Sequence, residues 1–287
     1  VKAAVVSREI STRDDIHETI IHTGQHFDPN MSDLFFEEMR IPAPGYNLKI
    51  NSLSHGAMTG KMLEEIEKVL IDKKPDWVLV YGDTNSTLAG ALAAKKLHIR
   101  VAHVEAGLRS FNMTMPEEIN RILTDRVSDI LFCPTETAIR NLQNEGFDHF
   151  DSRVVLSGDV MLDAALFYRQ YSRPPQIELK RDFVLATLHR AENTDTPEYL
   201  SEIIRALETI SREQDVLLPL HPRTRAKLEA SGYNTRLSPI RFIDPVGYLE
   251  MIHLLDKCLL VMTDSGGLQK EAFFFRKYCI TLRNETE

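Results

Sequence analysis

The chain has 287 residues, enough for one large domain or two ordinary ones. With 43% hydrophobic and 26% charged residues, its composition is typical of a soluble globular protein with a sizeable core. The net charge of −8 argues against non-specific binding to nucleic acid or anionic membranes, and there is no apolar run of about 18 residues to cross a bilayer. We therefore expect no nucleic acid and no membrane among its partners.

Strand-like and helix-like patterns alternate along nearly the whole chain. Several strand-like segments are continuous apolar runs, which is typical of strands covered on both faces of a parallel sheet. Amphipathic helices lie between them, for example at residues 60–74 and 197–213. The repeated order predicts a doubly wound α/β fold with right-handed crossovers. The expected strands are 18–23, 76–82, 100–104, 129–133, 153–158, 183–188, 215–220, 240–243, 259–263 and 278–282.

The alternation breaks at residues 171–182, which contain paired prolines and polar residues without periodicity. This segment predicts a linker between two Rossmann-like domains, which we place at 1–171 and 178–287. Ligands of doubly wound sheets bind at the carboxyl ends of the strands, so we expect a central cleft between two facing domains. Polar residues that directly follow strands are therefore the candidates for function.

Acidic residues follow the expected strands of the first domain. Asp83 and Glu105 each end a strand, and Glu117 opens a helix a few residues further on. Structural alternatives exist, because an aspartate suits a helix N-cap, a glutamate suits a solvated loop, and acids are favoured in a first helical turn. Glu117 and Arg121 also have the spacing of a helical i,i+4 ion pair. Glu118 is expected to point away from Glu117 and to face solvent.

Basic and small polar residues follow the expected strands of the second domain. His189 and Arg190 end one strand, and an arginine there can hold a phosphate through a bidentate contact, although a lone histidine is more often structural. The stretch TDSGGLQKEA follows another strand, and free backbone N–H groups at a helix start suit a phosphate. The alternative is an ordinary glycine-containing turn. Within this stretch, the ligand-binding candidates are Ser265, Gly266, Gly267 and Glu271.

The three cysteines, Cys133, Cys258 and Cys279, lie in apolar strand-like segments and lack CxxC spacing. We interpret them as buried free thiols in a reducing compartment, which predicts a cytoplasmic protein. No His/Cys cluster has zinc spacing, and neither a Walker A nor a GxSxG motif occurs. We expect no metal site.

Six motifs occur in the order GDTNSTLAG, HVEAGLRS, MPEEINR, HRAEN, LPLHPRTR and TDSGGLQKEA. In this the chain resembles the non-hydrolysing UDP-N-acetylglucosamine 2-epimerases, over essentially its whole length. The resemblance implies the GT-B fold, with the active site between two Rossmann-like domains. It implies reversible conversion of UDP-GlcNAc to UDP-ManNAc for cell-surface polysaccharide synthesis, without a cofactor or a required metal, by a homodimer.

The resemblance also implies roles for individual residues. The residues that match the family's catalytic positions are Asp83, Glu105, Glu117 and His189. The residues that match or adjoin its substrate-binding positions are Lys2, Arg121, Arg190, Ser265, Gly266, Gly267 and Glu271. Two further residues, Gln25 and His26, match part of the family's allosteric UDP-GlcNAc site.

The implied mechanism is elimination and re-addition. A base removes the C2 proton of the sugar while UDP leaves C1, and UDP adds back to the resulting 2-acetamidoglucal after protonation from the opposite face. His189 is expected at the diphosphate or the leaving oxygen. The family's N-terminal loop and a C-terminal region are not among these residues, so the resemblance implies a chain truncated at both ends.

Other functions stay open at this point. A GT-B glycosyltransferase or a non-catalytic UDP-sugar binder would use the same fold, although three carboxylates in the first domain favour the epimerase. Within the family, the variants GDTNSTLAG, MPEEINR and RNETE are also compatible with a 2-epimerase of UDP-2,3-diacetamido-2,3-dideoxyglucuronate.

Overall fold

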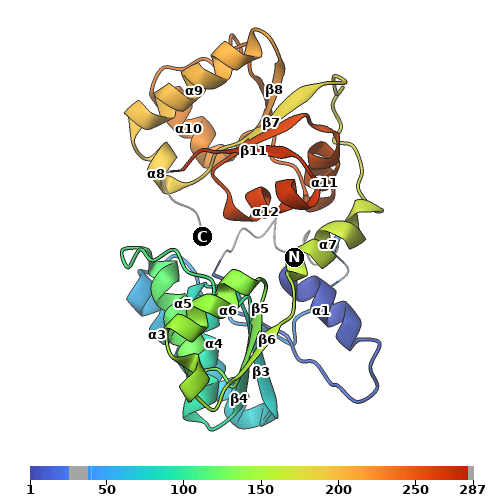
Figure 1. Ribbon diagram of the computed structural model, residues 1–287. Helices are drawn as coiled ribbons and strands as arrows, with labels where there is room; N and C mark the ends of the chain where they lie inside the picture. The colour runs from blue at the N-terminus through green and yellow to red at the C-terminus, as the bar shows by residue number, and fades with distance from the viewer. Residues whose placement is uncertain (26–37, 40, 284–287) are drawn as a thin grey trace. The chain divides into compact units, whose positions relative to one another are not determined.

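The computed structural model describes residues 1–25, 38–39 and 41–283, and it divides the chain into two compact units at Asp163 and Ala164. Each unit contains a parallel sheet with helices packed on it (Figure 1). The division lies within helix α7 (Val160–Arg169), a few residues before the linker that the sequence predicted. The end of α7 belongs to the second unit because Tyr168 packs edge-on against Tyr248 and Arg169 pairs with Asp256.

The main sheet of unit 1 has the strand order β3-β4-β5-β6, and all its strand pairs are parallel. A separate parallel pair, β1 with β2, was predicted only in part, because β2 has two residues and shows no periodicity. The strands are β1 (Ile21–His22), β2 (Tyr46–Asn47), β3 (Trp77–Tyr81), β4 (Arg100–Val104), β5 (Ile130–Cys133) and β6 (Arg153–Leu156). The helices before α7 are α1 (Lys2–Ile10), α3 (His55–Lys73), α4 (Asn85–Lys96), α5 (Pro116–Val127), α6 (Glu136–Asn144) and the 3₁₀ turn η1 (Phe147–His149).

The sheet of unit 2 has the order β11-β10-β7-β8-β9 and is also parallel throughout. Its strands are β7 (Phe183–Thr187), β8 (Asp215–Pro219), β9 (Arg241–Ile243), β10 (Leu260–Thr263) and β11 (Tyr278–Thr281). Its helices after α7 are α8 (Ala191–Thr194), α9 (Pro197–Ser211), α10 (Pro222–Ala230), α11 (Tyr248–Lys257) and α12 (Gly266–Phe274). The strand segments expected from sequence are confirmed, with ends that differ by up to three residues.

Strand β7 explains why the strands read as continuous apolar runs. Val184 and Ala186 pack on one face of the sheet with residues of α9 and α10, whereas Phe183 and Leu185 pack on the other face with α11 and α12. Figure 1 shows these two helix pairs on opposite sides of the sheet. Because both faces are covered, every residue of β7 is buried, and its first four residues are apolar without alternation.

Small residues let α4 lie close to the sheet of unit 1. Ala89, Ala91, Ala93 and Ala94 are fully buried, and a Cβ added at Gly90 would lie 3.2 Å from Val80. Helix α4 begins with a reciprocal cap in which Thr84 and Thr87 each accept from the other's backbone N–H. Thr84, rather than Asp83, is thus the N-cap of α4, so the Asp83 carboxylate does not cap this helix.

The sequence also predicted buried free thiols and no membrane-spanning segment. Cys133, Cys258 and Cys279 are free thiols; the first two are buried and Cys279 is partly exposed. Among the described residues, no helix combines the length and the apolar character that crossing a membrane requires.

Candidate functional site

Asp83 and Glu105 lie at the same edge of the unit 1 sheet. Tyr81 of β3 is paired with Val104 of β4, so the residues that follow these two strands emerge side by side. The N–H of Gly82 donates to the carbonyl of Val104 over 3.0 Å and closes the turn. A Cβ built at Gly82 would lie 3.4 Å from a Glu105 carboxylate oxygen, which shows how closely that carboxylate covers the turn.

Glu105 has a strained backbone, which it shares with six other non-glycine residues of the described part of the chain. Its φ of 71° lies in the left-handed region, which is costly for a residue with a side chain. Strain of this kind collects at active sites, where the surrounding structure maintains it. The side chain is buried and forms an ion pair with the Nζ of Lys2, at the start of α1. The structure therefore brings two predicted site residues together, Lys2 and Glu105.

Arg121 connects Asp83 at this edge to Glu118 of α5. Its guanidinium lies 2.6 Å from Asp83 and 2.9 Å from Glu118, and Arg121 is only 2% exposed. The sequence predicted an ion pair of Arg121 with Glu117; the structure shows Arg121 paired with Asp83 and Glu118. Glu117 itself is half-buried in the first turn of α5.

The prediction that Glu118 faces solvent is wrong. Its side chain is 1% exposed and accepts hydrogen bonds from the backbone N–H groups of Ser110 and Phe111, at 3.0 and 2.8 Å. Burial opposes ionisation, but these bonds and Arg121 outweigh it and lower the pKa of Glu118. Glu118 shares the buried face of α5 with Arg121 and Asp125, three and seven residues further on, whereas the apolar Ile119 and Leu123 are exposed. The loop at 110–111 binds Glu118 on this polar face.

A buried network beneath the edge was missed by sequence reasoning. His103 is fully buried; one ring nitrogen lies 2.7 Å from the carbonyl of Gly82 and the other 2.7 Å from Asp125. Asp125 also accepts from the N–H of Gly107 over 3.1 Å. The network thus ties down the turn before Asp83 and the turn after Glu105. The sequence carried no signal for it, because Asp125 lies on the polar side of the amphipathic pattern of α5, and it is this polar side that the fold buries.

Arg109 completes that network. It donates to Asp125 over 2.7 Å and forms two further bonds to Glu145, at 2.6 and 2.8 Å. Such a two-pronged arginine pair has a defined direction as well as a favourable energy. The ionisable residues between His103 and Asp125 therefore fall into two groups. Glu105 and Arg121 lie at the edge, and His103, Arg109 and Asp125 support it from beneath.

In unit 2, His189 and Arg190 follow β7, as predicted, and their backbone is bound by Asp264. The Asp264 carboxylate, fully buried after β10, lies 3.0 Å from the N–H of His189 and 2.9 Å from that of Arg190. The Asn193 amide donates to it as well, over 3.1 Å. Asp264 was not among the predicted residues, although it stands beside Ser265 at a strand end.

Helix α12 begins as the sequence predicted. Ser265 is its N-cap and accepts from the N–H of Leu268, and Gly266 and Gly267 form the first turn. This leaves backbone N–H groups at a glycine-rich helix start, an arrangement that suits a phosphate. Glu271, one turn further, is buried and accepts from the hydroxyl of Tyr248 over 2.9 Å. Burial raises the pKa of Glu271 to about 7.

The two residues matched to an allosteric site are described only in part. The side-chain oxygen Oε1 of Gln25 accepts from the backbone N–H and hydroxyl of Ser86, at 3.1 and 2.9 Å, at the start of α4. His26 lies outside the described residues. A regulatory role of this pair stays a prediction.

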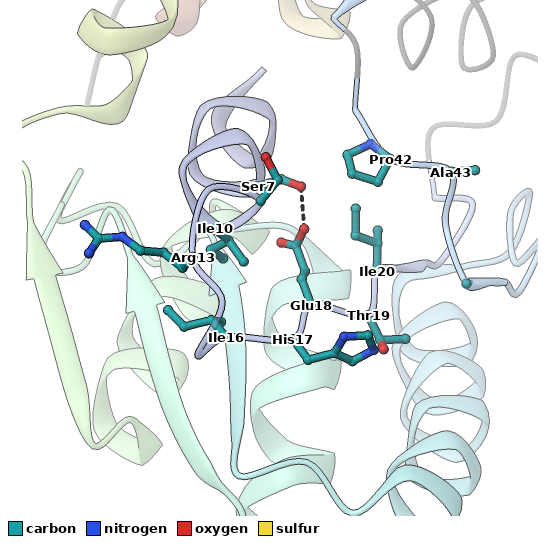
Figure 2. A pocket seen from close by; sticks show the side chains of 12 residues that line it. Ser7, Ile10, Arg13, Ile16, His17, Glu18, Thr19, Ile20, Pro42 and Ala43 are labelled. Atoms are coloured by element: carbon teal, nitrogen blue, oxygen red, sulfur yellow. Dashed lines mark hydrogen bonds between the residues drawn. The ribbon is translucent and has the colours of Figure 1, made fainter.

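A separate pocket of 340 Å³ lies in unit 1 between α1, the segment 16–20 and the segment 42–45 (Figure 2). Ser7 donates to Glu18 across it. The described residues that line it include none of the predicted site residues. We assign it no part in the site.

Two α/β units with parallel sheets, together with the similarity to solved UDP-GlcNAc 2-epimerase structures, define the protein as one of the GT-B fold. A family model described as UDP-N-acetylglucosamine 2-epimerase matches residues 8–287. The chain belongs to this family.

Individual relatives agree with the family. A UDP-2,3-diacetamido-2,3-dideoxy-D-glucuronate 2-epimerase of Pseudomonas aeruginosa is 60% identical, over all of this chain and 81% of the relative. A UDP-N-acetylglucosamine 2-epimerase of Methanococcus maripaludis is 46% identical over the same shares. The crystal structure of Methanocaldococcus jannaschii UDP-GlcNAc 2-epimerase with UDP-GlcNAc and UDP has a TM-score of 0.89 and 45% identity, covering 99% of this chain and 81% of that one. The chain is therefore a UDP-sugar epimerase by family.

Proposed function

We propose that the protein epimerises C2 of a UDP-2-acetamido sugar, and that its substrate is UDP-2,3-diacetamido-2,3-dideoxy-D-glucuronate. The observation that carries the reaction is the cluster of Asp83, Glu105 and Arg121 at one strand edge, with Glu117 opening the adjacent helix. The substrate is favoured by identity, 60% to the relative named for this sugar against 46% and 51% to two Methanococcus maripaludis relatives named for UDP-GlcNAc. This reverses the order expected from sequence, and UDP-GlcNAc becomes the second candidate.

The proposed reaction needs two proton-transfer groups and a site for the leaving diphosphate. A carboxylate takes the C2 proton, the C–H electrons form the C1–C2 double bond, and the C1–oxygen bond breaks with UDP as the leaving group. A second acid then protonates C2 from the opposite face as UDP returns to C1. Asp83, Glu105 and Glu117 are the proposed acid/base set, and their order of action is left unassigned.

Unit 2 supplies the proposed diphosphate and ribose contacts. His189 and Arg190 bring a ring and a guanidinium to the end of β7, and the start of α12 offers N–H groups from Gly266 and Gly267. Donors placed at the leaving oxygens stabilise the charge that develops there. Glu271 is proposed to accept from the ribose hydroxyls.

Solvent exchange tests the mechanism. In D₂O, product formed by elimination should carry deuterium at C2, and product without deuterium would reject this route. Glu105→Gln should reduce turnover by about 10²–10⁴-fold while UDP still binds by calorimetry. Glu136→Gln, in the exposed first turn of α6, is the matched control and should leave turnover unchanged.

Substrate competition tests the specificity. Each UDP-sugar is supplied alone, and products are identified by NMR and mass spectrometry. We expect the higher kcat/KM for the diacetamido glucuronate; a higher value for UDP-GlcNAc would restore the other assignment. Turnover without any acceptor argues against a glycosyltransferase, and binding without isomerisation would mean a UDP-sugar binder.

Assembly and regulation are proposed on the family resemblance alone. We propose a cytoplasmic homodimer, which light scattering on the purified protein tests directly. Regulation through Gln25 predicts that Gln25→Ala changes the response of the rate to added UDP-GlcNAc; an unchanged response argues against that role.

A further inference from the structure

The loop that carries His189 is anchored on a single buried carboxylate. Strands β7 and β10 are paired with Thr187 opposite Thr263, so Asp264 emerges from the sheet next to the His189 loop. Asp264 is fully buried and accepts the N–H groups of both His189 and Arg190. These two bonds hold the backbone of the loop in place, independently of the conformations of the His189 and Arg190 side chains.

The imidazole of His189 meets the same carboxylate with one nitrogen only. Its Nδ1 lies 3.1 Å from Oδ1 of Asp264, whereas the side chain as a whole is 49% exposed. Burial opposes ionisation of Asp264, but the hydrogen bonds from His189 and Arg190 outweigh it and hold the pKa of this carboxyl below its usual range. An ionised carboxylate only accepts hydrogen bonds, so Nδ1 must carry a proton.

We propose that Asp264 is a positioning residue that selects the Nδ1–H tautomer of His189 and so presents Nε2 to the UDP-sugar. This inference rests on the proposed function, in which His189 meets the leaving diphosphate. In the neutral ring, Nε2 is an acceptor; in the imidazolium, Nδ1 donates to Asp264 and Nε2 donates to an oxygen of the leaving group. Asp264 stabilises that imidazolium without taking its proton.

A substitution that preserves size separates this role from simple packing. In Asp264→Asn, one oxygen remains to accept the backbone N–H groups, and the new amide donates toward Nδ1. The ring must then keep Nδ1 unprotonated and carry its one proton on Nε2, so it cannot become the imidazolium that Asp264 stabilises opposite the leaving group. We expect a loss of roughly 10²–10⁴-fold in kcat with a smaller change in KM.

Long-range ¹H–¹⁵N NMR of the ring nitrogens reads the tautomer without any substrate. The His189 signals are assigned by their loss in His189→Gln. In the wild-type chain at alkaline pH we expect a protonated Nδ1 and an unprotonated Nε2, and in Asp264→Asn the reverse. A wild-type spectrum with the proton on Nε2 overturns the proposal, and this result does not depend on whether the variant folds.

The kinetic readout needs a carboxylate control from the same unit. Asp195 is exposed and pairs with Arg223 and Lys227, so Asp195→Asn should change neither the tautomer nor kcat by more than about twofold. A reversed tautomer in Asp264→Asn with normal kcat would overturn the positioning role. A wild-type chain that turns over neither UDP-sugar would refute the proposed function instead, and leaves the tautomer result standing.

Discussion

Arg121 of α5 reaches the carboxylate of Asp83 at the end of β3, with 2.6 Å between Nη1 and Oδ2. The arginine side chain is buried, whereas that of Asp83 is 31% exposed. A predicted substrate-binding residue thus orients a predicted acid/base residue, and the side chain that faces outward is the carboxylate. The same guanidinium pairs with Glu118, so it also joins the start of α5 to the loop before it.

Replacing Arg121 with methionine should destabilise unit 1 by about 3–5 kcal/mol, because Glu118 would be left as a buried charge without its cation. The only tryptophan of the chain, Trp77, lies in β3 and reports unfolding of this unit in urea. Arg140→Met, on the exposed side of α6, is the control and should stay within about 0.5 kcal/mol of wild type. If Arg121→Met changed the free energy of unfolding as little as this control does, Arg121 would not be the cation that stabilises buried Glu118.

Glu118→Gln should lower the free energy of unfolding by about 2 kcal/mol near neutral pH. The carboxylate accepts hydrogen bonds from two backbone N–H groups and a guanidinium, whereas the new amide NH₂ would point a donor at one of these donors. The folded pKa of Glu118 is lowered, so its contribution is complete above the unfolded pKa and is lost as pH falls through the folded one. The difference between wild type and variant should shrink below about pH 4. A difference independent of pH would show that Glu118 is not ionised in the folded state.

We expect the contribution of Glu271 to stability to have the opposite pH dependence. Its folded pKa is about 7, above the unfolded value, so the folded chain keeps a proton that the unfolded chain has lost. Stability of unit 2 should therefore fall as pH rises from about 4 to 7, and Glu271→Gln should be more stable than wild type at pH 8 by up to about 3 kcal/mol. Hydrogen exchange of α11 and α12 measures this.

The control for that measurement is Glu202→Gln on the exposed side of α9. It should leave the pH profile of wild type unchanged, because an exposed carboxylate has no burial cost to relieve. If Glu271→Gln also follows the wild-type profile, the carboxyl is not protonated in the folded state.

Gly107 and Gly146 allow the cost of a positive φ to be measured separately from the cost of a steric clash. Gly107, after Glu105, has φ of 78°, and a Cβ there would lie 2.5 Å from the carbonyl oxygen of Ala138. Gly146 has nearly the same φ, 81°, with no atom within 4 Å of such a Cβ. Gly107→Ala should cost about 3 kcal/mol or more in urea unfolding, and Gly146→Ala about 1 kcal/mol. Equal costs would mean that the turn moves freely away from Ala138.

The sequence by itself determined the fold class and most of the strands, because apolar runs between turn residues are local signals. It also placed Asp83, Glu105, His189 and Ser265 at strand ends, and the parallel register of β3 with β4 confirms that Asp83 and Glu105 emerge together. The two-residue strand β2 was beyond it, since no periodicity exists over so short a span.

Only the tertiary structure decided which charged residues face outward and which are buried supports. Glu117 and Glu118 are neighbours with the same chemistry, yet the loop at Phe111 covers one and not the other. Asp125 and Asp264 read as ordinary acids in sequence, but each accepts hydrogen bonds from backbone far away in the chain, at Gly107 and at His189. Such roles depend on which segments meet in space, and that is set by packing of the whole unit rather than by local pattern.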